Sequence, residues 1–161
     1  MQQVAEKYMR EALREAARAK EEGEVPVGAV IVMGGRIISR GRNRVEKNQR
    51  ATAHAEIEAI NKACAKLKSW RLEGAELYVT LEPCAMCAGA IAGARIKKVY
   101  FGAYEHKSGC AVSLYPVLTD NGLNHRAEYK GGVLKEECAA LVKDFFRSRR
   151  QEKAKDSPAA P

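Results

Sequence analysis

The sequence has no apolar run long enough to cross a membrane. Its longest apolar stretch, Val25–Met33, spans about nine residues and contains Pro26 and Gly28, whereas a membrane-spanning helix needs roughly twenty. The first twenty residues contain many charged side chains and lack the apolar segment of a secretory signal. We therefore expect a cytoplasmic protein with no membrane partner.

Cysteine and histidine are scarce, with five and three residues respectively among 161. An odd number of cysteines without an export signal favours reduced thiols or metal ligands over a disulfide framework. No internal repeat is present, and the chain length fits a single domain. We expect this domain at residues 1–150, followed by a basic, frayed tail at residues 151–161.

Positive charge is in excess. Lysine and arginine total 28 against 20 acidic residues, which gives a net charge of +8. Such a balance favours a polyanionic partner such as nucleic acid, because attraction to a phosphate backbone is long-range and gains from counterion release. The alternative is an ordinary solvated basic surface.

Hydrophobic spacing at the start of the chain predicts a helix followed by a hairpin. Apolar side chains recur every three or four residues from Val4 to Ala16, and Gly23 supplies a stop. Two strands, Val27–Val32 and Ile37–Ser39, then flank Gly34-Gly35, a pair suited to a tight turn. These strands should pair antiparallel.

The rest of the chain alternates between helices and strands. Helical stripes run from His54 to Leu67 and from Leu134 to Phe145, and a third helix is expected at Cys84–Ala94 with Pro83 in its first turn. Apolar runs predict strands at 77–81 and 97–103, and residues 109–124 should form a loop with one helical turn. This order predicts an α/β layered domain whose mixed, mostly parallel sheet has about five strands.

Two short motifs carry the candidate chemistry, His54-Ala55-Glu56 and Pro83-Cys84-Ala85-Met86-Cys87. Each opens a predicted helix, and Cys84 and Cys87, at i and i+3, share one face of the first turn. His54 would be a third ligand. Three protein ligands plus a water are typical of catalytic zinc, whereas a structural zinc site needs four protein ligands.

Glu56 is the candidate proton shuttle. Its separation of two from His54 points the two side chains apart on a regular helix, so spacing alone does not bring both into one site. A helix that begins at His54 would open its N-terminal end toward a cleft, where His54 binds the metal and Glu56 reaches the water. In parallel sheets, such clefts lie beyond the carboxyl ends of the strands.

The pattern H-x-E followed by P-C-x-x-C is the signature of zinc-dependent nucleobase deaminases. Beyond it, the chain resembles the bacterial tRNA-specific adenosine deaminases, in the cytidine deaminase superfamily, over nearly its whole length. The segments that carry this resemblance are Val25–Val30, Thr52–Ile57, Thr80–Ile91, Asn124–Arg126, Glu137–Ala140 and Phe145–Arg150.

The resemblance implies a cytidine-deaminase-like α/β/α fold, a homodimer and one Zn²⁺ per subunit. It also implies a tRNA anticodon stem-loop as partner, with the wobble adenosine of tRNA-Arg (ACG) converted to inosine. By position, His54, Cys84 and Cys87 would bind zinc and Glu56 would move protons. The substrate contacts that it implies are Asn43, Glu105, Lys107, Phe146, Arg149 and Arg150.

One position departs from the family pattern. After Phe101-Gly-Ala, similar proteins carry Asp, any residue and Lys, where this chain has Glu105-His106-Lys107. The family Asp lies near the sugar of the target nucleotide. Glu105 has the same charge as Asp, but its extra methylene places the carboxylate farther from the backbone. This difference could change the preference for RNA over DNA.

Three alternative functions remain open at this point. A deaminase of free guanine, cytosine or a nucleoside would keep the same metal motif. A non-catalytic zinc module that binds RNA would use Glu56 only as a helix-opening acid. A dithiol oxidoreductase would use the Cys84–Cys87 spacing alone.

Overall fold

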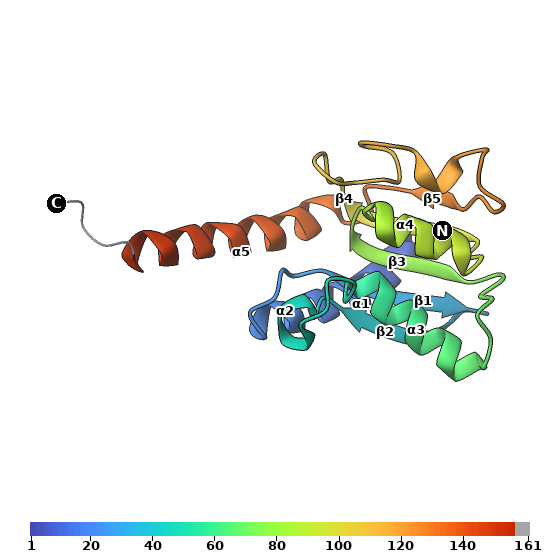
Figure 1. Cartoon of the computed structure of the whole chain (residues 1–161), viewed down its shortest axis with the longest axis horizontal. Coiled ribbons are helices and arrows are strands. Elements are labelled where there is room, and N and C mark those ends of the chain that lie inside the picture. The colour runs from blue at the N-terminus through green and yellow to red at the C-terminus, as the bar shows by residue number, and fades with distance from the viewer. Residues whose placement is uncertain (157–161) are drawn as a thin grey trace.

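The computed structural model describes residues 1–156, and residues 157–161 of the expected tail lie outside the described residues. Its elements follow in the order α1 (Gln2–Glu21), β1 (Gly28–Met33), β2 (Arg36–Arg42), α2 (Val45–Asn48), α3 (Ala55–Leu67), β3 (Glu76–Leu81), α4 (Ala85–Gly93), β4 (Lys98–Ala103), the 3-10 turn η1 (Val117–Thr119), β5 (Glu128–Lys130) and α5 (Lys135–Asp156). Figure 1 shows this arrangement, in which α5 extends away from the body.

The five strands form one sheet in the order β2-β1-β3-β4-β5. β1 pairs antiparallel with β2 and with β3, whereas β3–β4 and β4–β5 are parallel pairs. Four strands therefore run in one direction and β1 alone opposes them, which confirms a mixed, mostly parallel sheet. The short strand β5 has no apolar pattern that would have predicted it.

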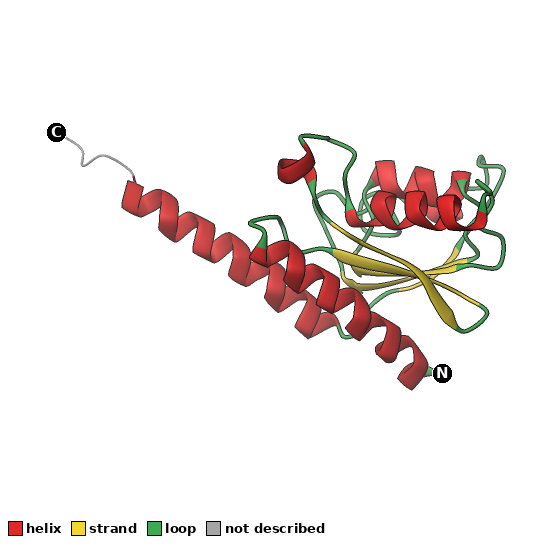
Figure 2. Ribbon diagram, turned by 90° about the horizontal axis from the view of Figure 1, so that it is seen from below, coloured by secondary structure: helices red, strands yellow, loops and turns green. Residues whose placement is uncertain are grey.

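Helices cover both faces of the sheet, with α1 and α5 on one side and α3 and α4 on the other (Figure 2). The alternation of side chains along β1 explains why both faces need covering. Ala29 and Ile31 point into the cluster under α3 and α4, and Val30 and Val32 point into the cluster under α1. Both faces of β1 are thus apolar, and nearly all of its residues are buried.

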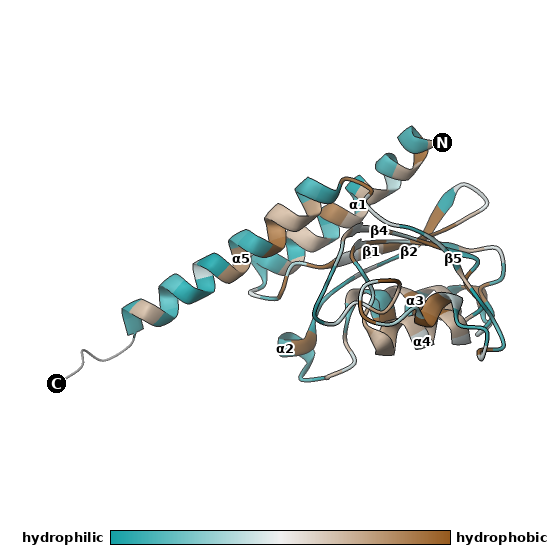
Figure 3. Ribbon diagram, turned by 90° about the horizontal axis from the view of Figure 1, so that it is seen from above, coloured by the Kyte–Doolittle hydropathy of each residue, from teal (hydrophilic) through white to brown (hydrophobic). Residues whose placement is uncertain are grey.

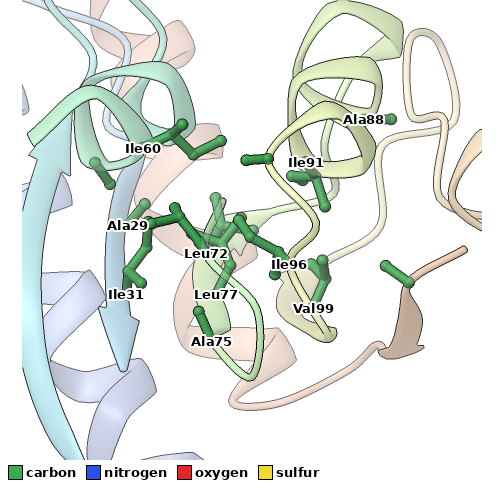
Figure 4. Packing of buried hydrophobic residues seen from close by; sticks show 14 of the residues in the cluster. Ala29, Ile31, Ile60, Leu72, Ala75, Leu77, Ala88, Ile91, Ile96 and Val99 are labelled. Carbon is green, nitrogen blue, oxygen red and sulfur yellow. The ribbon is translucent and has the colours of Figure 1, made fainter. Parts of the chain in front are cut away.

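The larger core cluster lies between the sheet and the α3–α4 layer. Figure 4 shows Ile60 of α3 and Ile91 of α4 above Ile31 and Leu77 of the strands. This packing fixes the N-terminal ends of α3 and α4 at the same edge of the sheet. Those two ends carry the candidate metal ligands.

Local turns match the sequence expectations in most places. Gly34 and Gly35 both have positive φ, at 58° and 75°, as a tight hairpin turn requires. Pro83 is a correction, because it precedes the N-cap residue Cys84 instead of lying in the first turn of α4. The helix α5 is longer than its apolar stripe and continues to Asp156, through six residues expected to fray.

Among residues 1–156, no helix combines the length and the apolar composition that a membrane crossing needs.

Candidate metal centre and substrate pocket

His54 and Cys84 occupy equivalent positions on two neighbouring helices. Each is the N-cap residue, with extended backbone, of α3 and α4 respectively. β2 and β3 run in the same direction, so the segments that follow them begin at the same edge of the sheet. The topology therefore brings together two residues that are thirty positions apart in the sequence.

The three expected metal ligands converge. The ligand atoms of His54, Cys84 and Cys87 all lie within 4.8 Å of one another. His54 Nδ1 is 3.6 Å from the sulfur of Cys84 and 3.6 Å from the sulfur of Cys87. A tetrahedral zinc with ordinary Zn–N and Zn–S bonds places such atoms roughly 3.6 Å apart. The donor set and its spacing therefore fit a zinc ion.

The protonation of the three side chains is coupled. A hydrogen bond with Cys87 lowers the pKa of Cys84 to about 4, assisted by its bond with His54. The bond with Cys84 raises the pKa of Cys87 and also that of His54. One sulfur is therefore favoured as a thiolate, the form in which cysteine binds metals.

Glu56 lies beside this group and is buried, with 4% of its surface exposed. It sits in the first turn of α3, two residues after the N-cap His54, as expected for a helix that opens toward a cleft. Burial raises the pKa of Glu56 above its ordinary value, and the nearby His54 partly opposes this effect. A carboxyl group in this setting can take up and release a proton closer to neutral pH.

A cavity of about 220 Å³ opens in front of these residues. Its lining comes from the segment before β1, the carboxyl ends of β2 and β3, the N-termini of α3 and α4 and the loop after β4. It comprises Val25, Val27, Asn43, His54, Ala55, Glu56, Leu81, Glu82, Cys84 and Ser108. The side chain of Asn43 is held in place, because its Nδ2 donates to the carbonyl of Val25 and its Oδ1 accepts from the backbone N–H of Val45.

A wider groove of about 740 Å³ leads from this pocket to α5. His54 and Asn43 line one end, and Phe146, Arg149 and Lys153 line the other. The structure thus brings Phe146 and Arg149, two of the expected substrate contacts, to a groove shared with the metal ligands. Arg150 is exposed on α5 and is not among the residues that line the groove.

The loop after β4 contributes a different residue from those expected. Ser108 lines the 220 Å³ cavity, and Glu105 and Lys107 do not. Instead, the carboxylate of Glu105 accepts the backbone N–H of Lys107 within its own loop. Sequence reasoning missed Ser108 and the buried Glu82, although Glu82 directly precedes the Pro83-Cys84 motif.

Known proteins resemble this chain over most of its length. A family model described as MafB19-like deaminase matches residues 4–150. The tRNA-specific adenosine deaminase of Bacillus subtilis (strain 168) is 53% identical over 148 residues, which is 92% of each chain. A structure from a study of A-to-I editing by tRNA:A34 deaminases has a TM-score of 0.81 and 45% identity, covering 83% of this chain and 97% of that one. A guanine deaminase of Bacillus subtilis has a TM-score of 0.59 and 42% identity, covering 62% and 64%.

The layered sheet and the His–Cys–Cys group define a deaminase with the cytidine-deaminase-like fold. The match to the family model and the 53% identity identify it further: the chain belongs to the MafB19-like deaminase family, among the tRNA-specific adenosine deaminases. The resemblance found in the sequence motifs is thereby confirmed.

Proposed function

We propose that this protein converts adenosine to inosine at the wobble position of a tRNA anticodon, in the cytoplasm, with tRNA-Arg (ACG) as substrate. The names of its relatives support the tRNA substrate and the wobble position, since they include a tRNA-specific adenosine deaminase and tRNA:A34 deaminases studied for wobble-position editing. One observation in this chain carries the proposal. Two of the three converging metal-binding residues and a buried carboxyl group line the same cavity, with the third ligand beside it.

His54, Cys84 and Cys87 would hold one Zn²⁺ per subunit and leave a fourth position for the cavity. Zinc bound in this way supplies Lewis acidity that lowers the pKa of water from about 15.7 toward 7. Glu56 would accept the proton of the attacking water and deliver protons to the ring nitrogen and to the departing ammonia. Its raised pKa suits a group that must do both.

The wide groove would hold the RNA around the flipped adenosine. Asn43 would contact the target nucleotide, because its amide is fixed at the junction of pocket and groove. Phe146 offers an exposed aromatic ring for stacking, and Arg149 and Arg150 would contact phosphates. Glu105 and Lys107 lie on the loop of Ser108, where they would meet nucleotides outside the pocket.

We also propose a homodimer, on the basis of one apolar surface. The helix α4 has no charged residue, and its exposed side carries Ala85, Gly89 and Gly93. Figure 3 shows α4 in the apolar colours, in contrast to the hydrophilic end of α5. Val112 and Tyr115, in the loop tied to the start of α4, are also exposed. Sedimentation at micromolar concentration should give a dimer, and a fully active monomer would exclude it.

In the deciding experiment, zinc-loaded protein is incubated with an RNA stem-loop that corresponds to one anticodon arm and carries the ACG anticodon. Inosine at the wobble position is the expected product, with a stem-loop carrying guanosine at that position as the control. Free guanine and cytosine are tested in parallel, because the similarity to a guanine deaminase favours that alternative. Ammonia release from a free base without inosine in the RNA would replace our proposal by the alternative.

Substitution of Glu56 distinguishes an enzyme from a zinc module that only binds RNA. Glu56→Gln should lower kcat by about 10²- to 10⁴-fold, because general acid–base catalysis contributes that much, and should leave zinc content and RNA affinity unchanged. Glu58→Gln, on the same helix and outside the cavity lining, is the matched control. Equal activity of the two variants would contradict the role of Glu56.

A further inference from the structure

Glu82 is a buried carboxylate whose partners are mainly backbone amides. It lies directly after β3 and has 3% of its surface exposed. Among residues 1–156, it forms no salt bridge with a lysine or arginine. A charge buried to this degree is costly unless hydrogen bonds satisfy it. The hydrogen-bond donors that surround this carboxylate therefore indicate its structural role.

The hydrogen bonds of Glu82 join the two ends of one loop. Oε1 accepts the backbone N–H of Glu105 at 3.1 Å, where the loop leaves β4. Oε2 accepts the backbone N–H groups of Ala111, Val112 and Ser113 at 3.1, 2.9 and 2.9 Å, and the hydroxyl of Ser113 donates to Oε1. One carboxylate thus closes the segment 105–113, which we call the clamped loop.

The clamped loop also contacts the turn that carries the first thiol ligand. The backbone N–H of Cys110 donates to the carbonyl of Pro83 at 2.7 Å, and Gly109 forms an isolated β-bridge with Cys84. A Cβ at Gly109 would lie 2.5 Å from the carboxyl carbon of Glu82. The loop backbone is therefore pressed against the carboxylate, and the carboxylate is two residues from a ligand.

Ser108 connects this arrangement to the pocket. It lies within the clamped loop and lines the 220 Å³ cavity, on the same side as Cys84. The distance between this wall and the metal ligands depends on where the loop is held. Glu82 binds both loop ends and thus acts on that distance together with the Cys110–Pro83 hydrogen bond and the Gly109–Cys84 bridge.

We infer that Glu82 is a positioning residue that sets the wall of the substrate pocket, an inference that rests on the proposed function of the same site. It is not a second proton shuttle, because both of its oxygens are already occupied by N–H and O–H donors. Glu56, in contrast, lines the cavity beside the metal-binding residues. The clamped loop presents Ser108 to the substrate only while the carboxylate holds both ends.

Glu82→Gln tests the inference with the whole protein, because the new amide NH₂ cannot accept the N–H groups that one carboxylate oxygen now accepts. With the ACG stem-loop, we expect kcat/KM to fall between about tenfold and a hundredfold, mostly through a higher KM, with stoichiometric zinc retained. Glu82→Asp keeps the charge and should recover part of the loss. Glu15→Gln is the matched control, because Glu15 is equally buried, at 3% exposure, but lies on α1.

A second measurement does not depend on activity. Hydrogen exchange of the peptides that cover residues 105–113 should become faster in Glu82→Gln and stay unchanged in Glu15→Gln. Where Glu82→Gln does not fold, Ser113→Ala removes a single hydrogen bond and should produce a smaller rise in KM and in loop exchange. If the wild-type protein makes no inosine but its loop is protected from exchange, and Glu82→Gln loses that protection, the clamp is supported and only the proposed substrate is rejected.

Two results would overturn the inference. Glu82→Gln with the KM and the loop exchange of the wild type would show that the carboxylate positions nothing. The second result is an equal loss of activity in Glu82→Gln and Glu15→Gln that follows the loss of thermal stability in both variants. It would show a general structural effect.

Discussion

Gly41 offers a direct test of how the fold positions the metal ligands. It lies in β2 beneath the first turn of α3, and a Cβ built there would come 2.2 Å from the carbonyl oxygen of Ala55 and 2.6 Å from the backbone nitrogen of Ala59. For Gly41→Ala, the strand and helix must separate by about 0.8 Å before the new methyl is 3.0 Å from that oxygen. The first turn of α3 is the turn that carries His54 and Glu56.

The size of the effect follows from the cost of overpacking. Forcing a methyl group into a filled space costs about 1 to 3 kcal/mol, and in a domain of this size each kcal/mol lowers Tm by about 2 to 4 °C. We therefore expect Gly41→Ala to lower Tm by about 2 to 12 °C and to reduce the zinc content of purified protein. Gly122→Ala is the control, because a Cβ at Gly122 would meet only Asp120 Oδ1, the end of an exposed side chain, at 3.1 Å.

Calorimetry and metal analysis on the two variants decide the question. A Gly41→Ala protein with wild-type Tm and stoichiometric zinc would refute the reasoning, because it would show that α3 can move without cost to the ligands. A fall in Tm without loss of zinc would show that the strain is absorbed away from His54.

Three further predictions concern the metal, the RNA and the acid stability. Zinc at a free concentration of a hundred times its Kd should raise the free energy of unfolding by about 2.7 kcal/mol over that of the zinc-free protein. A chelator should therefore lower Tm, and added zinc should restore it. Arg150→Ala should weaken RNA binding and reduce the slope of log K against log salt concentration by about 1, without changing Tm. Arg149→Ala should have the same effect on RNA binding and should also lower Tm, because Arg149 donates to the carbonyl of Gly23 at 2.5 Å. The hydrogen bond from Arg42 lowers the pKa of Glu22 in the folded protein. The contribution of this ion pair to the free energy of unfolding is therefore complete above the ordinary carboxyl pKa, and it is lost as the pH falls through the lowered pKa. Wild type and Glu22→Gln should therefore differ in urea unfolding at pH 7 and converge in acid, and a difference that persists in acid would contradict this ion pair.

Most of the fold was predictable because hydrophobic spacing determines which side chains a layer can bury. The apolar stripe of α1 and the continuous apolar run of β1 follow this rule, and Gly34-Gly35 marks the turn after β1. The exceptions are elements without an apolar stripe. β5 has three exposed residues, and the end of α5 continues to Asp156 in a run of mostly strong helix formers such as Arg, Gln, Glu, Lys and Ala.

The metal group was predictable from spacing, because His54 and the two cysteines each belong to a short motif at a helix start. Glu56 was harder to place, since its position depended on where α3 begins. The N-cap at His54 resolves this, because it puts Glu56 in the first turn with its side chain buried beside the ligands. The convergence of His54, Cys84 and Cys87 was therefore predictable from the sequence, whereas the position of Glu56 depended on one helix boundary.

One part of the pocket lining, Ser108 with the carboxylate that holds its loop, was not predicted from the sequence, and the reason is physical. Two segments beside the pocket are each held by a buried carboxylate that binds backbone amides, a contact that leaves no pattern of residue types. Glu24 accepts the N–H groups of Glu46 and Lys47 at 3.0 and 2.8 Å and so fixes α2 next to Asn43, as Glu82 fixes the clamped loop next to Ser108. Backbone amides are present at every residue except proline, so any sequence with the correct loop length could supply the donors. Only the acidic partner is specific, and its burial is apparent only once the chain has folded.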